Sequence, residues 1–138
     1  MPEILLAEDN SADVYLIREA LKEHGIVCPL RLATDGKDVL RLISFQDPPD
    51  EDIDFSLIIL DLNLPRHDGI EILQRLRENP NLTHVPVVVL TSSDSPRDRL
   101  MATNLGAARF IRKPSNLEEF LSLGAVFKTL LSNGKELS

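Results

Sequence analysis

The feature that most constrains the fold is an alternation of short apolar runs with longer segments of helical period. Parallel strands need a crossover between them, usually a helix, so this alternation predicts β-α-β units and an α/β fold with a parallel sheet. The runs at 57–60 and 85–90 are continuously apolar, as expected of central strands that helices cover on both faces. The predicted strands span residues 3–7, 30–33, 57–60, 85–90 and 108–112.

Amphipathic helices are predicted between and after these runs, at residues 12–24, 37–45, 70–79, 97–105 and 117–131. Asn10 or Ser11 can cap the first helix, and Gly25 suits the left-handed turn that often follows a helix. The fifth helix is predicted to end near Gly134. The segment QDPPDEDIDF, residues 46–55, predicts a solvated loop longer than the usual connection.

Length and charge limit the classes of function. A chain of 138 residues fits one domain, which we expect over residues 1–132 with a short C-terminal tail over 133–138. The net charge of -7, with no basic run, argues against a nucleic-acid partner. No signal peptide or membrane span is evident. The single cysteine, Cys28, is interpreted as a small buried hydrophobe in a reducing compartment, which predicts a cytoplasmic protein.

Residues that carry chemistry directly follow four of the five predicted strands. Ligands of an open parallel sheet bind outside the carboxyl ends of its strands, so these residues are predicted to converge at one edge. Each residue alone has an ordinary explanation, such as an acid near a helix start or a solvated lysine. Their coincidence in order along the chain favours a site. They are Glu8 and Asp9 after the first strand, Asp61 after the third, Thr91 after the fourth and Lys113 after the fifth.

Three carboxylates at one edge repel each other, and a hard cation removes that penalty. Mg²⁺ prefers one or two carboxylates together with waters and phosphate oxygens, so we expect the three acids and the backbone carbonyl of Asn63 to bind it. Asp61 could then attack phosphorus as a covalent nucleophile. The Lys113 ammonium and the Thr91 hydroxyl would meet the charge on the transferred group.

The motifs that contain these residues resemble the signature of response-regulator receiver domains. They are EDN at 8–10, LDLNLPRHDG at 60–69, VLTSSD at 89–94 and FIRKP at 110–114, and the resemblance covers almost the whole chain. It implies a flavodoxin-like, doubly wound, five-stranded parallel sheet of order 2-1-3-4-5 with five helices, and phosphorylation by a histidine kinase. It also implies residue roles: Asp61 as phosphoacceptor, Glu8 and Asp9 as the acidic pair, Thr91 as switch hydroxyl, Phe110 as switch aromatic and Lys113 as phosphate-binding lysine.

A narrower resemblance concerns the kinase partner. The long loop, the phrase DLNLP at 61–65 and the segment SNLEEFL at 115–121 are similar to regulators that partner bacterial phytochromes.

Two further features concern association between copies of the chain and the histidines. The segment 117–131 carries more apolar positions than one buried stripe needs, which predicts a homodimer through the fourth helix, fifth strand and fifth helix, unless both sides of the stripe are buried. His24, His67 and His84 are interpreted as surface side chains.

Two other classes compete with a signalling protein. An aspartyl-phosphate enzyme of the haloacid-dehalogenase class needs a second acid two residues after its nucleophile, and that position is Asn63, whose amide cannot protonate a leaving group. A flavodoxin-type carrier needs a phosphate loop of Ser, Thr and Gly amides, whereas EDNSAD would repel a flavin phosphate. We therefore expect a phosphoacceptor protein that assists its own phosphorylation and dephosphorylation but is not an enzyme.

Overall fold

Five parallel strands form one sheet in the order β2-β1-β3-β4-β5 in a computed structural model of the chain. The structure describes residues 2–44, 54–93 and 95–136. This order confirms the predicted doubly wound sheet, in which β2 is added on one side of β1 and the later strands, from β3 on, are added on the other side. The strands are β1 (Glu3–Ala7), β2 (Leu30–Ala33), β3 (Phe55–Leu60), β4 (Val87–Thr91) and β5 (Arg109–Arg112).

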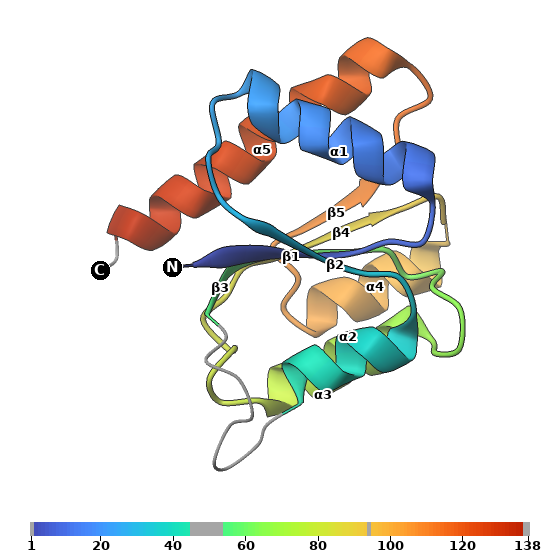
Figure 1. Cartoon of the computed structure of the whole chain (residues 1–138). Helices are drawn as coiled ribbons and strands as arrows, with labels where there is room; N and C mark the ends of the chain where they lie inside the picture. Colours follow the sequence, from blue (N-terminus) through green and yellow to red (C-terminus); the bar gives the residue numbers. More distant parts are fainter. Residues whose placement is uncertain (1, 45–53, 94, 137–138) are drawn as a thin grey trace.

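Five helices connect and follow the strands and cover both faces of the sheet. α1 and α5 lie on one face and α2, α3 and α4 on the other (Figure 1). None of the helices in the described part of the chain is long and apolar enough to cross a membrane. The helices are α1 (Ser11–Glu23), α2 (Gly36–Ile43), α3 (Gly69–Glu78), α4 (Pro96–Asn104) and α5 (Leu117–Glu136).

The core has two parts, one on each face of the sheet, because side chains alternate between the faces along a strand. In β3, Leu57 and Ile59 belong to the cluster that packs with α1 and α5. Ile58 and Leu60 belong to the cluster that packs with α2, α3 and α4. The continuous apolar run of this strand therefore reflects burial on both faces, as its sequence predicted.

Several element ends differ from those predicted. β3 begins at Phe55, and β4 begins only at Val87, because the Val85 amide donates to the Leu82 carbonyl in a turn (3.1 Å) and Pro86 has no amide hydrogen. α5 continues through Gly134 to Glu136, since glycine in a helix costs only about 1 kcal/mol. Most of the predicted loop at 46–55, and the predicted end of the second helix at Phe45, lie outside the described residues.

Helix capping follows the predicted chemistry. Asn10 is the N-cap of α1, and its side-chain oxygen accepts hydrogen bonds from the amides of Ala12 (3.0 Å) and Asp13 (3.1 Å). Gly25 and Gly106 follow α1 and α4 with positive φ angles of 69° and 83°. A glycine in the left-handed conformation ends each of these two helices without steric cost.

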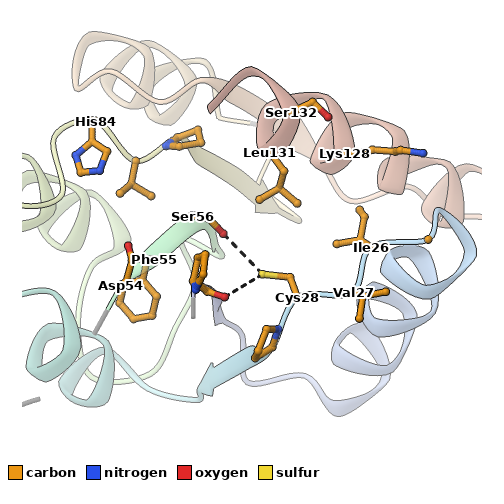
Figure 2. A pocket seen from close by; sticks show the side chains of 15 residues that line it. Ile26, Val27, Cys28, Asp54, Phe55, Ser56, His84, Lys128, Leu131 and Ser132 are labelled. Atoms are coloured by element: carbon orange, nitrogen blue, oxygen red, sulfur yellow. Dashed lines mark hydrogen bonds between the residues drawn. The ribbon is translucent and has the colours of Figure 1, made fainter. Parts of the chain in front are cut away.

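A pocket of about 650 Å³ opens beside the amino ends of the strands, at the edge opposite Asp61. Figure 2 shows Cys28 at its wall, with the thiol turned toward Ser56. The Cys28 Sγ donates to the Pro2 carbonyl (3.3 Å) and lies 3.8 Å from the Ser56 Oγ. The expectation of a buried cysteine is therefore wrong, because this thiol is half-buried and has polar neighbours.

α1 and α5 pack so closely at Gly124 that a Cβ there would overlap the Ala20 carbonyl oxygen and the His24 ring. We predict that Gly124→Ala lowers the free energy of unfolding by about 1–3 kcal/mol, because overpacking outweighs the gain in helix propensity. Urea denaturation measures this change. Ser132→Ala, at an exposed position of the same helix, is the matched control and should leave stability within about 0.5 kcal/mol. A Gly124→Ala variant as stable as the wild type would contradict this account of the α1–α5 contact.

Candidate functional site

The residues that follow the strands are held at one edge of the sheet by continued backbone pairing. The amide of Asp61 donates to the Ala7 carbonyl (3.0 Å), and the amide of Glu8 donates to the Ala33 carbonyl (3.0 Å). In the same way, the Lys113 amide donates to the Thr91 carbonyl (2.8 Å). Each side chain therefore starts from a rigid part of the fold, and the predicted convergence is confirmed.

The acids predicted from sequence form a compact group. Glu8, Asp9 and Asp61 each offer a carboxylate oxygen, and these atoms all lie within 4.8 Å of one another. Glu8 and Asp61 are buried, whereas Asp9 is exposed and keeps the group open to solvent. Hard oxygen donors at this spacing, with one accessible side, suit a divalent cation such as Mg²⁺ or Ca²⁺.

Lys113 neutralises part of this negative charge. Its Nζ lies 2.8 Å from Glu8 Oε1, 3.0 Å from Asp61 Oδ2 and 2.7 Å from Asp13 Oδ2, and its side chain is only 13% exposed. Burial alone would lower the pKa of Lys113, but the hydrogen bonds to Asp13, Glu8 and Asp61 raise it. The lysine is therefore fully charged at neutral pH.

Burial affects the two buried acids differently. Desolvation, helped by the negative charge of Asp61, raises the pKa of Glu8 to about 7 against the opposing effect of Lys113. Desolvation also acts on Asp61, but hydrogen bonds from the Asn63 amide and from Lys113 outweigh it and lower the pKa of Asp61. Asp61 is therefore the buried acid that remains ionised at neutral pH, as a carboxylate nucleophile must.

Asn63 connects Asp61 to the predicted switch hydroxyl. Its amide donates to Asp61 Oδ1 (3.0 Å), and its side-chain Nδ2 donates to Thr91 Oγ1 (3.2 Å). Thr91 is fully buried, and its hydroxyl oxygen also accepts from the Ser93 amide (3.3 Å). The sequence predicted a role only for the backbone carbonyl of Asn63, because it gave no information on which way the amide side chain points.

Asp13 is the site residue that sequence reasoning missed. It lies in the first turn of α1, where an acid is ordinarily explained by the helix dipole. The available signal was its place in the first turn of the helix that directly follows Glu8 and Asp9, which puts it near the same edge of the sheet.

The loop from Asp61 to α3 is fixed by close contacts at two glycines. A Cβ at Gly69 would overlap the backbone of Leu62, and a Cβ at Gly36 would overlap the side chain of His67. Arg66, in the same loop, has a positive φ of 81°, which is uncommon for a residue other than glycine.

His67 is half-buried against α2, so its interpretation as a surface side chain is wrong. The tight packing of this loop is the reason. His24 is likewise half-buried, whereas His84 is exposed as predicted.

Phe110 lies on β5 and pairs with Val89 of β4. Val89 is two residues before Thr91, so Phe110 and Thr91 belong to the same face of the sheet. Its ring is half-buried, and the Arg99 guanidinium of α4 lies 4.6 Å from the ring centroid. The Arg99 Nη1 also donates to the Phe110 carbonyl (3.5 Å). The predicted switch aromatic is thus in contact with α4.

Comparison with known proteins agrees with this geometry. The family model of the response regulator receiver domain matches residues 4–123. Response regulator Rcp1 of Synechocystis sp. is 36% identical over 120 residues, which cover 87% of this chain and 82% of that protein. Transcriptional regulatory protein HprR of Escherichia coli is 38% identical over 120 residues, and the chain spans about half (48%) of its length.

Solved structures give the same result at the level of the fold. The Mn²⁺-bound form of Rcp1 superposes with a TM-score of 0.83 at 33% identity, covering 94% of this chain and 93% of that one. The phosphorylated cyanobacterial phytochrome response regulator RcpA superposes with a TM-score of 0.83 at 32% identity, covering 96% and 95% of the two chains. The site, the fold and these similarities agree, and the chain belongs to the response regulator receiver domain family.

Proposed function

We propose that this protein accepts a phosphoryl group on Asp61 from a histidine kinase, with Mg²⁺ as cofactor, and signals through a changed interaction surface. The observation that carries the proposal is the ion pair between Asp61 Oδ2 and Lys113 Nζ at 3.0 Å, within a group of three acids whose oxygens lie within 4.8 Å. The phosphorylated state of RcpA and the bound Mn²⁺ of Rcp1 support the same chemistry here.

The residues divide the work of phosphotransfer. An oxygen of the ionised Asp61 carboxylate attacks phosphorus, and the bond between phosphorus and the kinase imidazole nitrogen breaks. The electron pair returns to that nitrogen, so an imidazole protonated on its other nitrogen leaves as a neutral ring. Bound by Glu8, Asp9, Asp61 and the Asn63 carbonyl, Mg²⁺ would neutralise charge on the phosphoryl oxygens. Lys113 offers a positive charge to the same oxygens.

Thr91 and Phe110 are proposed to convert the modification into a change of surface. The Thr91 hydroxyl can donate to a phosphoryl oxygen, and its movement toward that oxygen would lengthen the hydrogen bond that Thr91 Oγ1 accepts from the Asn63 side-chain Nδ2. Movement of Thr91 frees space on the face of the sheet that Phe110 shares, so the ring can turn inward and leave Arg99. The signal would thus pass to α4, whose described residues include one buried side chain, Ala102.

The likeness to the phytochrome response regulator RcpA favours a phytochrome as the kinase partner. We further propose that the protein acts in the cytoplasm, because the free thiol of Cys28 is typical of a reducing compartment. The receiver domain would comprise residues 1–132, with the last turn of α5, which ends at Glu136, extending beyond it. The protein would act as a phosphoacceptor and not as an enzyme on an external substrate, since it holds the phosphoryl group on its own carboxylate until water removes it.

We also propose the face made by α4, β5 and α5 as the output surface and as the contact of a homodimer. Leu100 on α4 and Leu117 on α5 are 62% and 60% exposed, so two of the elements that form this face each carry a large exposed apolar side chain. Phe120 and Phe127 of α5 are 3% and 0% exposed and pack in the core. Much of the apolar excess predicted for α5 is therefore buried, and the homodimer rests on Leu100 and Leu117.

The phosphoacceptor is tested by replacing its carboxylate with an amide, which is too weak a nucleophile to attack phosphorus. In acetyl phosphate and Mg²⁺, Asp61→Asn should show no phosphorylated species in intact-protein mass spectrometry, whereas the wild type should gain one phosphoryl group. Asp68→Asn is the matched control, because it changes an acid of the same loop. Asp68 is the N-cap of α3, and asparagine can also serve as an N-cap. Labelling of Asp61→Asn at the wild-type rate would refute the assignment.

Metal binding is tested at the exposed acid of the group. We predict that Asp9→Ala weakens Mg²⁺ binding by about tenfold or more, or about 1.4 kcal/mol, because one of three charged oxygen ligands is lost. Isothermal titration calorimetry measures this affinity. Asp38→Ala, which removes an exposed acid of α2, should leave the affinity within about twofold. An unchanged affinity in Asp9→Ala would exclude the proposed metal site.

The homodimer is tested by light scattering at tens of micromolar protein, with and without beryllofluoride and Mg²⁺. We expect Leu100→Asp and Leu117→Asp to shift the protein toward monomer, because a charge in an apolar contact is left without a partner. Tyr15→Asp, at a side chain of α1 that is 61% exposed, is the matched control and should not change the mass. A wild type that stays monomeric under both conditions would rule out the dimer.

A further inference from the structure

We propose that Asp13 is a positioning residue that holds the Lys113 ammonium in place while one of its hydrogen bonds is transferred from Asp61 to the phosphoryl group. The inference rests on the proposed phosphotransfer to Asp61. It assigns a function to a carboxylate that belongs neither to the group of three acids nor to the switch pair. The evidence lies in the partners of the lysine.

A lysine ammonium has three N–H donors and no acceptor. In this structure three carboxylate oxygens lie within hydrogen-bond distance of Lys113 Nζ, one each from Glu8, Asp13 and Asp61. They come from three places in the fold: the end of β1, the first turn of α1 and the end of β3. Three separate elements therefore fix the position of one flexible side chain, whose exposed fraction is 13%.

Asp13 differs from the other two partners in what else its carboxylate must do. Glu8 and Asp61 contribute oxygens to the group that suits a divalent cation, whereas Asp13 does not belong to that group. A bound cation would draw electron density from the Glu8 and Asp61 oxygens and weaken them as acceptors for the lysine. Asp13, which makes the shortest of the three contacts at 2.7 Å, would keep its full charge for Lys113.

Phosphorylation changes the third bond of the ammonium. When an Asp61 oxygen bonds to phosphorus, the carboxylate becomes a neutral acyl group and a weaker acceptor, while the new phosphoryl oxygens are strong ones. The N–H that points to Asp61 then turns to a phosphoryl oxygen. Because Asp13 and Glu8 still hold the other two N–H groups, the ammonium makes this change without having to be reordered from solvent.

The alternative is that Asp13 only stabilises the start of α1 through the helix dipole. Under that alternative, removing its charge would alter helix stability but would not change the environment of Lys113. The two explanations therefore differ in measurements made on the lysine itself. Asp38→Asn serves as the matched control, because Asp38 is also an acid in the first turn of a helix and pairs with Arg41 at 3.3 Å.

The first experiment measures the chemical reactivity of Lys113 without metal or phosphoryl donor. The protein is treated briefly with an amine-acetylating reagent, and peptide mass spectrometry compares the acetylation of Lys113 with that of exposed Lys128 in the same sample. We expect the Lys113 to Lys128 ratio to rise at least about threefold in Asp13→Asn and to stay at the wild-type value in Asp38→Asn. An unchanged ratio in Asp13→Asn would overturn the proposal, and this result does not depend on whether Asp61 is phosphorylated.

The second experiment measures beryllofluoride affinity at saturating Mg²⁺ in a double-mutant cycle of Asp13→Asn and Lys113→Ala. We expect Asp13→Asn to weaken binding about tenfold in the wild-type background and by less than about twofold when Lys113 is already absent, since Asp13 acts through the lysine. Equal effects in both backgrounds, or tighter binding in Asp13→Asn, would overturn the positioning role. Failure of the wild-type protein to bind beryllofluoride at all would instead refute the proposed function.

Discussion

The site depends on one ammonium group shared among carboxylates at the carboxyl edge of the sheet. Glu8 and Asp61 are 1% and 4% exposed, and two buried acids in contact would ordinarily cost several kcal/mol or lose their charge. Lys113 offsets much of that cost with hydrogen bonds of 2.8 and 3.0 Å. The offset is incomplete at Glu8, because burial still raises its pKa to about 7. The fold therefore holds Asp61 as a buried carboxylate beside a single close positive charge, which is the state that the proposed phosphotransfer requires.

The topology of the sheet makes this sharing possible between residues far apart in sequence. β1 and β3 are parallel neighbours at the point where the order of strand addition reverses, so the acids that follow them are adjacent. β5 is at the edge of the sheet, and the long side chain of Lys113 extends from there to partners that are 52 and 100 residues away along the chain. A core on each face of the sheet fixes the strands on which these side chains depend. The rigidity of the site therefore derives from the two-sided core.

The sequence was sufficient to predict that the residues after the strands meet, because strand ends in a parallel sheet meet at one edge whatever their side chains do. It was not sufficient for interactions that depend on helix phase or on rotamers. The contact of Asp13 with Lys113 needs the exact rotation of α1, and the bond from Asn63 to Thr91 needs the direction of one amide. The same limit explains Phe127, whose apolar character could not show that it faces α1 and the sheet and not a second molecule.

The balance of charge at the site sets an order for its ligands. Among the described residues, Glu8, Asp13 and Asp61 share the Lys113 ammonium and Asp9 lies beside them, so carboxylates outnumber the ammonium at this edge. A phosphoryl group carries about 1.5 to 2 negative charges near pH 7, and it would meet repulsion at this edge unless a cation were bound first. Cation binding would also favour the ionised form of Glu8, because it supplies the opposite charge that burial withholds. From the excess of carboxylates over ammonium we therefore expect a cation to bind before the phosphoryl group arrives, with Lys113 already held by its carboxylate partners.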